Sequence, residues 1–298
     1  MYDIIILGSG PAGLTAALYT ARAGKKTLIL GGDKLGGQTA SIAVLENYPG
    51  WTGNGMELAE FMKNQATSFG AEIIFSSAKS VTGGGEKGFT VLADDGKKYN
   101  SKVVIIATGA SPRKLTIDGA RELFGKGVSY CATCDGFFYN DKTVLVIGGG
   151  NSALNDALYL SDLAKTVKIV YRGSSFTRAE KILIDRVKSK KNIECVFNTE
   201  LKSIHPKLES TELIATTLDD KKIECDGVFV AIGHEANTDY LSEDIKRDEM
   251  GRLAPESLPD GMFVAGDVHS NIKMQIATAV GTGCEAAINA IGYINTKL

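Results

Sequence analysis

The chain has 298 residues, of which 44% are hydrophobic and 23% charged, and its formal net charge is −2. This length predicts about two domains of ordinary size. The absence of a long basic block excludes a nucleic-acid binder, and no apolar run approaches the roughly 20 residues that span a bilayer. We therefore expect a cytoplasmic protein with neither nucleic-acid nor membrane partners.

The chain opens with a dinucleotide-binding pattern. An apolar run from Ile4 to Leu7 is typical of a strand that is buried on both faces of a parallel sheet. A glycine-rich turn follows at once, and apolar residues then recur at helical spacing. Such glycines permit a tight turn and leave the first N–H groups of the helix facing a pyrophosphate. The predicted contacts are Gly8, Gly10, Pro11, Ala12 and Gly13.

The same pattern returns in the middle of the chain. The strand from Val144 to Ile147 leads into a second glycine-rich turn and a helix from Leu154. One such motif is a weak signal, but two copies in the same strand–turn–helix context indicate two related nucleotide-binding folds. The predicted contacts of the second turn are Gly148, Gly150, Asn151, Ser152 and Ala153.

A later strand shows how the two folds are connected. The apolar run from Met262 to Ala265 leads into Gly266 and has no counterpart in the second unit, so it should complete the first. The predicted fold class is α/β, with two Rossmann-like domains, the second inserted into the first, and a small antiparallel sheet in each. The expected domains are residues 1–113 with 241–298, and residues 114–240.

Arginines mark the expected donor site of the second unit. An acidic residue about 20 positions after the glycines normally binds an adenosine ribose. Here Arg172 stands at the strand end, with Arg178 after it, and guanidinium groups suit a 2′-phosphate. This favours NADPH over NADH, although two solvated arginines on an exposed loop are the alternative.

The first unit has candidates for a second cofactor. Asp33 stands at the expected distance from the first turn, but it follows two glycines and so carries little weight. The backbone of Gly36-Gly37-Gln38 could approach a cofactor closely, and Asp267 could accept hydrogen bonds from a polyhydroxy chain such as ribitol. Both features are consistent with a flavin nucleotide.

The pair Cys131 and Cys134 has three interpretations. A zinc site lacks further ligands with suitable spacing, and buried packing beside Phe137 and Phe138 is the second alternative. Redox chemistry is favoured, because a C-x-x-C dithiol closes a reversible disulfide. The adjacent Asp135 suits a proton carrier. Because sulfur is a poor hydride partner, a flavin would link the nicotinamide to the disulfide, and the final acceptor would lie outside the chain.

These residues together resemble bacterial-type, low-molecular-weight thioredoxin reductase over essentially the whole chain. The resemblance rests on both glycine turns, Gly36-Gly37-Gln38, residues 46–50, residues 131–136 and residues 265–267. It implies that Cys134 faces the flavin, that Cys131 attacks the disulfide of thioredoxin or a thioredoxin-like protein, and that Asp135 handles the proton. It also implies a homodimer with FAD in the first domain and NADPH in the second. The further implied FAD contacts are Gly31, Gly32, Gly36, Gly37, Gln38, Asn47, Gly109, Gly266, Asp267 and Gln275.

One departure from the family pattern concerns the 2′-phosphate. The family has a His-Arg-Arg start and a further arginine, whereas this chain has Tyr171-Arg172-Gly173 and then Arg178 after one extra residue. NADPH remains the expected donor, with NADH, ferredoxin or a reduced deazaflavin as the alternatives. A non-catalytic flavin sensor and a ferredoxin:NADP reductase fit less well, because neither needs the cysteine pair. For Cys195, Cys225 and Cys284 we expect packing roles only.

Overall fold

The computed structural model describes residues 1–298, and the chain divides into two compact units. The first unit comprises Met1–Ser111 and Glu235–Leu298, and the second comprises Pro112–His234. The return to the first unit comes earlier than the predicted boundary at 240/241. The reason is that Ala236, Tyr240 and Leu241 pack in the core of the first unit.

A seven-stranded sheet forms the centre of the first unit, in the order β5-β2-β1-β8-β7-β6, with β19 paired to β8. β19 lies parallel to β8, so the late strand completes the first sheet, as the sequence predicts. β6 and β7 form the antiparallel part. The bounds are β1 (Tyr2–Leu7), β2 (Thr27–Leu30), β5 (Glu72–Ile74), β6 (Ala78–Gly83), β7 (Phe89–Ala93), β8 (Lys98–Ile106) and β19 (Met262–Val264).

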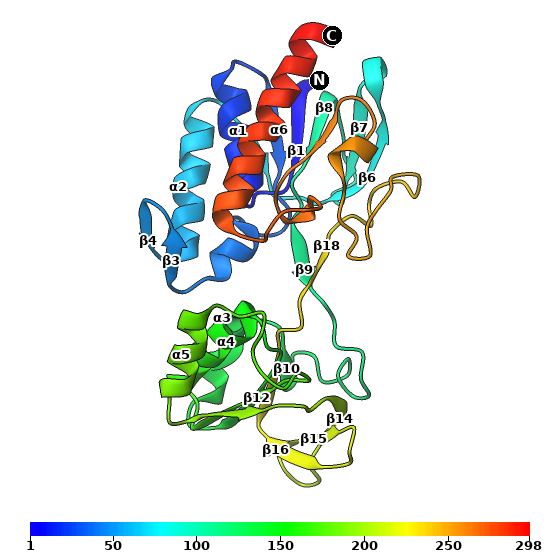
Figure 1. Ribbon diagram of the computed structural model, residues 1–298. Helices are drawn as coiled ribbons and strands as arrows, with labels where there is room; N and C mark the ends of the chain where they lie inside the picture. The colour runs from blue at the N-terminus through cyan, green and yellow to red at the C-terminus, as the bar shows by residue number, and fades with distance from the viewer. The chain divides into compact units, whose positions relative to one another are not determined.

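Both faces of this sheet are covered. In β1, Ile4 and Ile6 face the core beneath the helices, whereas Ile5 and Leu7 face the opposite core. Successive side chains of a strand point to opposite faces, which explains the unbroken apolar run. Figure 1 shows the three helices of the unit together on one face: α1 (Pro11–Arg22), α2 (Gly55–Ser68) and α6 (Ile276–Lys297). No helix of the chain is both long enough and apolar enough to cross a membrane.

The second unit repeats this plan on a smaller scale. Its five-stranded parallel sheet has the order β10-β17-β11-β12-β13, and a separate antiparallel sheet has the order β14-β15-β16. The strands are β10 (Val128–Ser129), β11 (Thr143–Ile147), β12 (Thr166–Val170), β13 (Ile193–Val196), β14 (Leu201–Pro206), β15 (Leu213–Thr217), β16 (Lys222–Cys225) and β17 (Gly227–Val230). The helices are α3 (Ala132–Asp135), α4 (Asn151–Ser161) and α5 (Lys181–Ser189).

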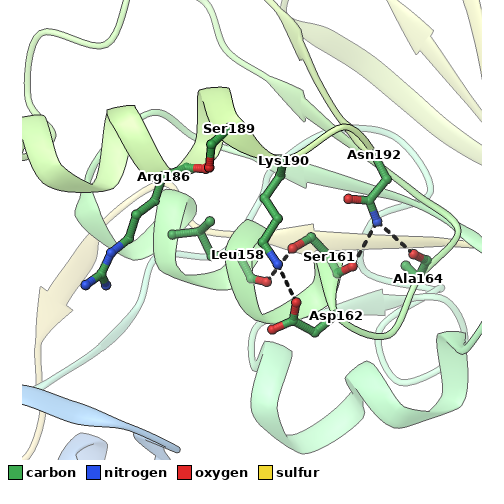
Figure 2. Close-up of polar contacts among 8 residues, drawn as sticks. All are labelled: Leu158, Ser161, Asp162, Ala164, Arg186, Ser189, Lys190 and Asn192. Atoms are coloured by element: carbon green, nitrogen blue, oxygen red, sulfur yellow. Dashed lines mark hydrogen bonds and ion pairs between the residues drawn. The ribbon is translucent and has the colours of Figure 1, made fainter.

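The carboxyl end of α4 is fixed by polar contacts from the segment after α5 (Figure 2). The side-chain amide of Asn192 donates to the carbonyl oxygens of Ser161 and Ala164, at 2.8 and 3.2 Å. Lys190 forms an ion pair with Asp162 in the same place. The two amide hydrogen bonds satisfy carbonyl groups at the end of α4 and just after it, and all three contacts hold this end against the segment that follows α5.

The two segments that connect the units pair with each other. β9 (Ala110–Pro112) and β18 (His234–Ala236) form a two-stranded sheet, and β3 (Leu45–Tyr48) and β4 (Trp51–Gly53) form another in the first unit. Short 3₁₀ helices complete the element list: η1 (Gly37–Ser41), η2 (Gly85–Lys87), η3 (Gly136–Tyr139), η4 (Pro255–Ser257) and η5 (Gly266–Val268).

Candidate active site and nucleotide cradles

The first glycine of each turn packs directly against backbone. Gly8 has φ +108°, and a Cβ atom there would lie 2.3 Å from the carbonyl oxygen of Ala107. Gly148 has φ +141°, and its Cβ would lie 2.2 Å from the carbonyl oxygen of Ala231. Both contacts are shorter than any van der Waals approach, so only glycine fits either position. The two turns are therefore built alike.

The helices that follow these turns begin without a side-chain cap. Gly10 and Gly150 are the N-cap residues of α1 and α4, and neither helix start has a side-chain hydrogen bond. No atom lies within 4 Å of where a Cβ on either glycine would be. Each helix therefore presents unsatisfied N–H groups and its positive dipole end to open space, and this arrangement fits a pyrophosphate. Both turns can hold a dinucleotide cofactor.

Further predicted residues gather around the first turn. A Cβ on Gly31 would lie 3.2 Å from the hydroxyl of Ser9, and one on Gly266 would lie 2.8 Å from the Cβ of Ala12. Gly36 donates its N–H to the carbonyl oxygen of Ser9 at 2.9 Å. Residues that are far apart in the sequence thus meet at the carboxyl ends of β1, β2 and β19, where open parallel sheets bind nucleotides.

Polar groups of the first unit also pair near this edge. Gln38 donates to the carbonyl oxygen of Ala110 at 2.6 Å, and Asn47 donates to the side chain of Gln275 at 3.2 Å. Asp267 forms no hydrogen bond, and its burial raises the pKa of the carboxyl. A partly buried carboxylate without a partner is costly, and ligand hydroxyl groups would satisfy it. Asp267 therefore fits the ribitol chain of FAD.

The other predicted residues of the first unit are more open. Gly32 and Gly109 have φ +71° and +64°, and a Cβ on Gly109 would meet no atom within 4 Å. Gly37 lies next to the turn, because its Cβ would be 3.8 Å from the Cα of Gly10. Asp33 is exposed, which agrees with the low weight that the sequence gives it.

Cys131 and Cys134 are joined by a disulfide. Cys134 is exposed and Cys131 half-buried, and no group of three His, Cys, Asp or Glu side chains has the arrangement of a metal site. The Sγ atom of Cys131 accepts the N–H of Cys134 at 3.2 Å and lies 3.5 Å from the hydroxyl of Thr133. Donors aimed at a sulfur favour its thiolate form, so these contacts suit a nucleophile at Cys131.

Ser129 connects this disulfide to Asp135. Its hydroxyl donates to the Asp135 carboxylate at 2.6 Å and accepts the N–H of Cys131 at 3.0 Å. Ser129 is only 3% exposed, so its hydroxyl is largely shielded from bulk water. This serine cannot be predicted from the sequence, because nothing in its local pattern distinguishes it from any buried residue at the end of a strand.

Two aromatic side chains beside the disulfide face solvent. Phe137 is 76% exposed and Phe138 is 68% exposed. This contradicts the alternative in which both phenylalanines bury the cysteines in a core. Tyr139 instead packs on Phe229, with ring centroids 5.3 Å apart, and burial followed by the charge of Asp135 raises its pKa. Exposed aromatic groups next to a reactive bond are typical of a protein-docking surface.

The three single cysteines lie in different environments. Cys225 is buried, and desolvation raises the pKa of its thiol to about 12, as expected of an inert packing residue. Cys284 is half-buried. Cys195 is exposed, so packing does not describe it. No partner cysteine is bonded to any of them.

Arg172 and Arg178 lie on the loop between β12 and α5, and both are exposed without an ion pair. In the neighbouring turn, Ala153 is buried against Gly148, while Ser152 is exposed in the first turn of α4. The side chain of Asn151 hydrogen-bonds to Glu180 rather than standing free. The second turn and the arginine loop therefore lie together.

Residues 2–283 match the family model described as pyridine nucleotide-disulphide oxidoreductase. The chain belongs to this family. Membership confirms the predicted fold and enzyme class. The predicted cofactors FAD and NADPH are those that the family uses.

Relatives and solved structures give the same result over the full length. The chain is 40% identical to a thioredoxin reductase of Rickettsia conorii, covering 98% of each chain. A crystal structure of Lactococcus lactis thioredoxin reductase matches with TM-score 0.92 and 34% identity, over 99% of both chains. A ferredoxin-flavin thioredoxin reductase from Clostridium acetobutylicum matches with TM-score 0.53 and 29% identity, over 99% of this chain and 97% of that one.

Proposed function

We propose that the chain is a thioredoxin-disulfide reductase that passes two electrons from NADPH through FAD and the Cys131–Cys134 disulfide to thioredoxin or a thioredoxin-like protein. The observation that carries the proposal is an accessible C-x-x-C disulfide in the same unit as an uncapped dinucleotide turn. The full-length similarity to thioredoxin reductases supports it.

The chemistry divides between the cofactors and the two cysteines. When bound, NADPH supplies a hydride and FAD converts it into electrons that a disulfide accepts. Opening the Cys131–Cys134 bond takes up two electrons and two protons. The Cys131 thiolate then attacks the thioredoxin disulfide to form a mixed disulfide, and Cys134 displaces the thioredoxin thiol and restores the internal bond.

Asp135 and Ser129 serve the proton balance of these steps. Each reduced thioredoxin disulfide leaves as two thiols, so protons must reach the departing sulfurs. Asp135 directly follows Cys134, and its carboxylate is held by the Ser129 hydroxyl at 2.6 Å. We assign Asp135 as the proton carrier and Ser129 as the residue that positions it.

Exposed apolar side chains support two partner assignments. Phe137 and Phe138 lie immediately after the redox motif and offer a docking surface for the thioredoxin-like partner. On α2, Met56 and Phe61 are also exposed, at 45% and 58%, which is consistent with the expected homodimer. Light scattering of the purified protein measures its molar mass and so tests the homodimer directly.

The same flavoprotein with a different electron donor is the second candidate. The observation in its favour is Gly173, which stands where the family pattern has an arginine. The similarity to a ferredoxin-flavin thioredoxin reductase adds weight, because that protein is named for a donor other than a nicotinamide.

Anaerobic stopped-flow reduction tests both candidates. The flavin of the purified holoenzyme is mixed with NADPH or NADH, and bleaching is followed in wild type, Arg172→Ala and Arg121→Ala. Arg121 is an exposed arginine of the same unit outside the loop, so its variant controls for the loss of positive charge. We expect fast bleaching by NADPH that only Arg172→Ala slows. No bleaching by either nucleotide would instead support the ferredoxin or deazaflavin donor.

A further inference from the structure

The loop that carries both free arginines is held on the second glycine turn. At its far end, the backbone N–H of Glu180 donates to the side-chain oxygen of Asn151 at 2.7 Å. The amide of Asn151 donates in return to a carboxylate oxygen of Glu180 at 2.8 Å. Asn151 is the first residue of α4 and follows the N-cap glycine. These paired hydrogen bonds connect the loop to the place where a pyrophosphate would lie.

Two more contacts hold the loop, one close to its far end and one at its start. Gly150 and Arg178 form an isolated parallel β-bridge. The ring of Tyr171 covers Gly149 so closely that a Cβ there would lie 2.5 Å from it. Gly173 touches the same ring, and its Cβ would lie 2.6 Å away. With the ring in this place, any side chain at position 173 would clash with it, so the ring occupies space that an arginine there would need.

The Asn151–Glu180 pair also determines which groups the arginines meet. Glu180 is the acidic side chain closest in sequence to Arg178, yet its carboxylate bonds to Asn151 and both arginines remain unpaired. Donors that are held in place and are free of competing carboxylates bind an anion with less ordering cost.

We propose that Asn151 and Glu180 are positioning residues for recognition of the donor's 2′-phosphate. Their paired hydrogen bonds hold the arginine loop at the pyrophosphate turn, so that Arg172 and Arg178 meet the phosphate together. This inference rests on the proposed use of NADPH. It concerns only the 2′-phosphate, because the rest of the nucleotide is bound by the turn itself.

If Glu180 acted only through its charge, its removal would change binding of the 2′-phosphate in the opposite direction. If the carboxylate of Glu180 acted only as a negative charge near the phosphate, its removal by any substitution would strengthen binding. If its oxygen acts as the acceptor for Asn151, glutamine preserves binding because it keeps that oxygen, and alanine weakens it. The directions differ, so the variants Glu180→Gln and Glu180→Ala separate the two roles.

Calorimetric titration of the FAD-loaded protein with 2′,5′-ADP and with ADP provides the test. We expect Glu180→Ala to weaken 2′,5′-ADP binding about fivefold, the effect of one hydrogen bond, and to leave ADP binding within about twofold. Glu180→Gln should match wild type. Glu200→Ala, which removes an exposed carboxylate of the same unit, should also match it.

Three results would overturn the inference. Tighter 2′,5′-ADP binding in Glu180→Ala would indicate a charge effect only, and unchanged binding would indicate that Glu180 has no role in recognition of the phosphate. Equal losses for 2′,5′-ADP and ADP would indicate general damage to the turn. A wild type that shows no preference for 2′,5′-ADP over ADP would refute the NADPH assignment itself, which distinguishes failure of the proposed function from failure of the positioning role.

Discussion

Substitution of Gly148 and Gly150 by alanine should separate folding from nucleotide binding. The two glycines lie two positions apart in one turn, yet an added methyl group meets opposite surroundings. At Gly148 it would lie 2.2 Å from the Ala231 carbonyl oxygen and 3.1 Å from the Cβ of Ala153, at φ +141°. At Gly150 it would meet nothing within 4 Å, and φ −98° is ordinary for alanine.

The expected magnitudes follow from these contacts. For Gly148→Ala, backbone strain costs roughly 1–3 kcal/mol and overpacking roughly 1–3 kcal/mol more. The sum is a large share of the ~5–15 kcal/mol that stabilises a typical domain. We expect the melting temperature to fall by roughly 10 °C or more. For Gly150→Ala, the free energy of unfolding should stay within about 0.5 kcal/mol of wild type.

Nucleotide affinity, in contrast to stability, should be lost in Gly150→Ala. The methyl group of Gly150→Ala occupies the open space at the start of α4, where the pyrophosphate is expected, so 2′,5′-ADP should bind at least about tenfold more weakly. Thermal melts by circular dichroism and calorimetric titration measure the two effects on the same samples. Full affinity in Gly150→Ala, or a loss of stability equal to that of Gly148→Ala, would refute this account of the turn.

Three further substitutions test the core, the disulfide site and a half-buried acid. Phe229→Ala removes a side chain that is 1% exposed and should lower the free energy of unfolding of the second unit by about 3–5 kcal/mol, as measured by urea unfolding. Trp51 lies in the other unit, so the urea midpoint that its fluorescence reports should not change. Ser129→Ala loses the hydrogen bond to the Asp135 carboxylate and should slow thioredoxin reduction about tenfold. Flavin bleaching by NADPH should not change, and slower bleaching would contradict the assignment of Ser129 as the residue that positions Asp135. Burial raises the pKa of Asp156 from 3.8 to about 7, so the folded state keeps a proton that the unfolded state releases, and stability falls as pH rises through that window. Asp156→Asn should therefore melt above wild type at pH 8 and level with it at pH 4, and equal melting at both values would contradict the shift.

Much of the fold is predictable because its signals are local. A buried parallel strand needs apolar residues on both faces, and the turn after it needs a glycine where the backbone bends against a neighbouring strand. Gly8 and Gly148 satisfy this requirement in the same way, so two matching motifs reveal two matching folds. The insertion of the second unit into the first is also predictable, because β19 has no counterpart in the second unit and pairs with β8 in the first.

The parts that sequence analysis misses depend on tertiary contacts. Ser129 reaches Asp135 only because β10 ends beside α3, and neither residue's neighbours indicate that pairing. Packing of Phe137 and Phe138 in a core is an alternative that the sequence leaves open, and only their exposure in the structure excludes it. The domain boundary predicted at 240/241 lies later in the chain than the observed one for a similar reason. Tyr240 follows a strand of the connecting segment, but it packs in the first unit.

The departure from the family pattern at Gly173 bears on the donor site. The Tyr171 ring lies against Gly149 and Gly173 together, so an arginine at 173 would displace the ring from the turn. A site built this way has two guanidinium groups for the phosphate, and each must contribute more of the binding energy. Fewer charges make the placement of those that remain more important, because a misplaced donor has no neighbour to replace it. The paired hydrogen bonds between Asn151 and Glu180 supply that placement, and a chain with a third arginine would depend on them less.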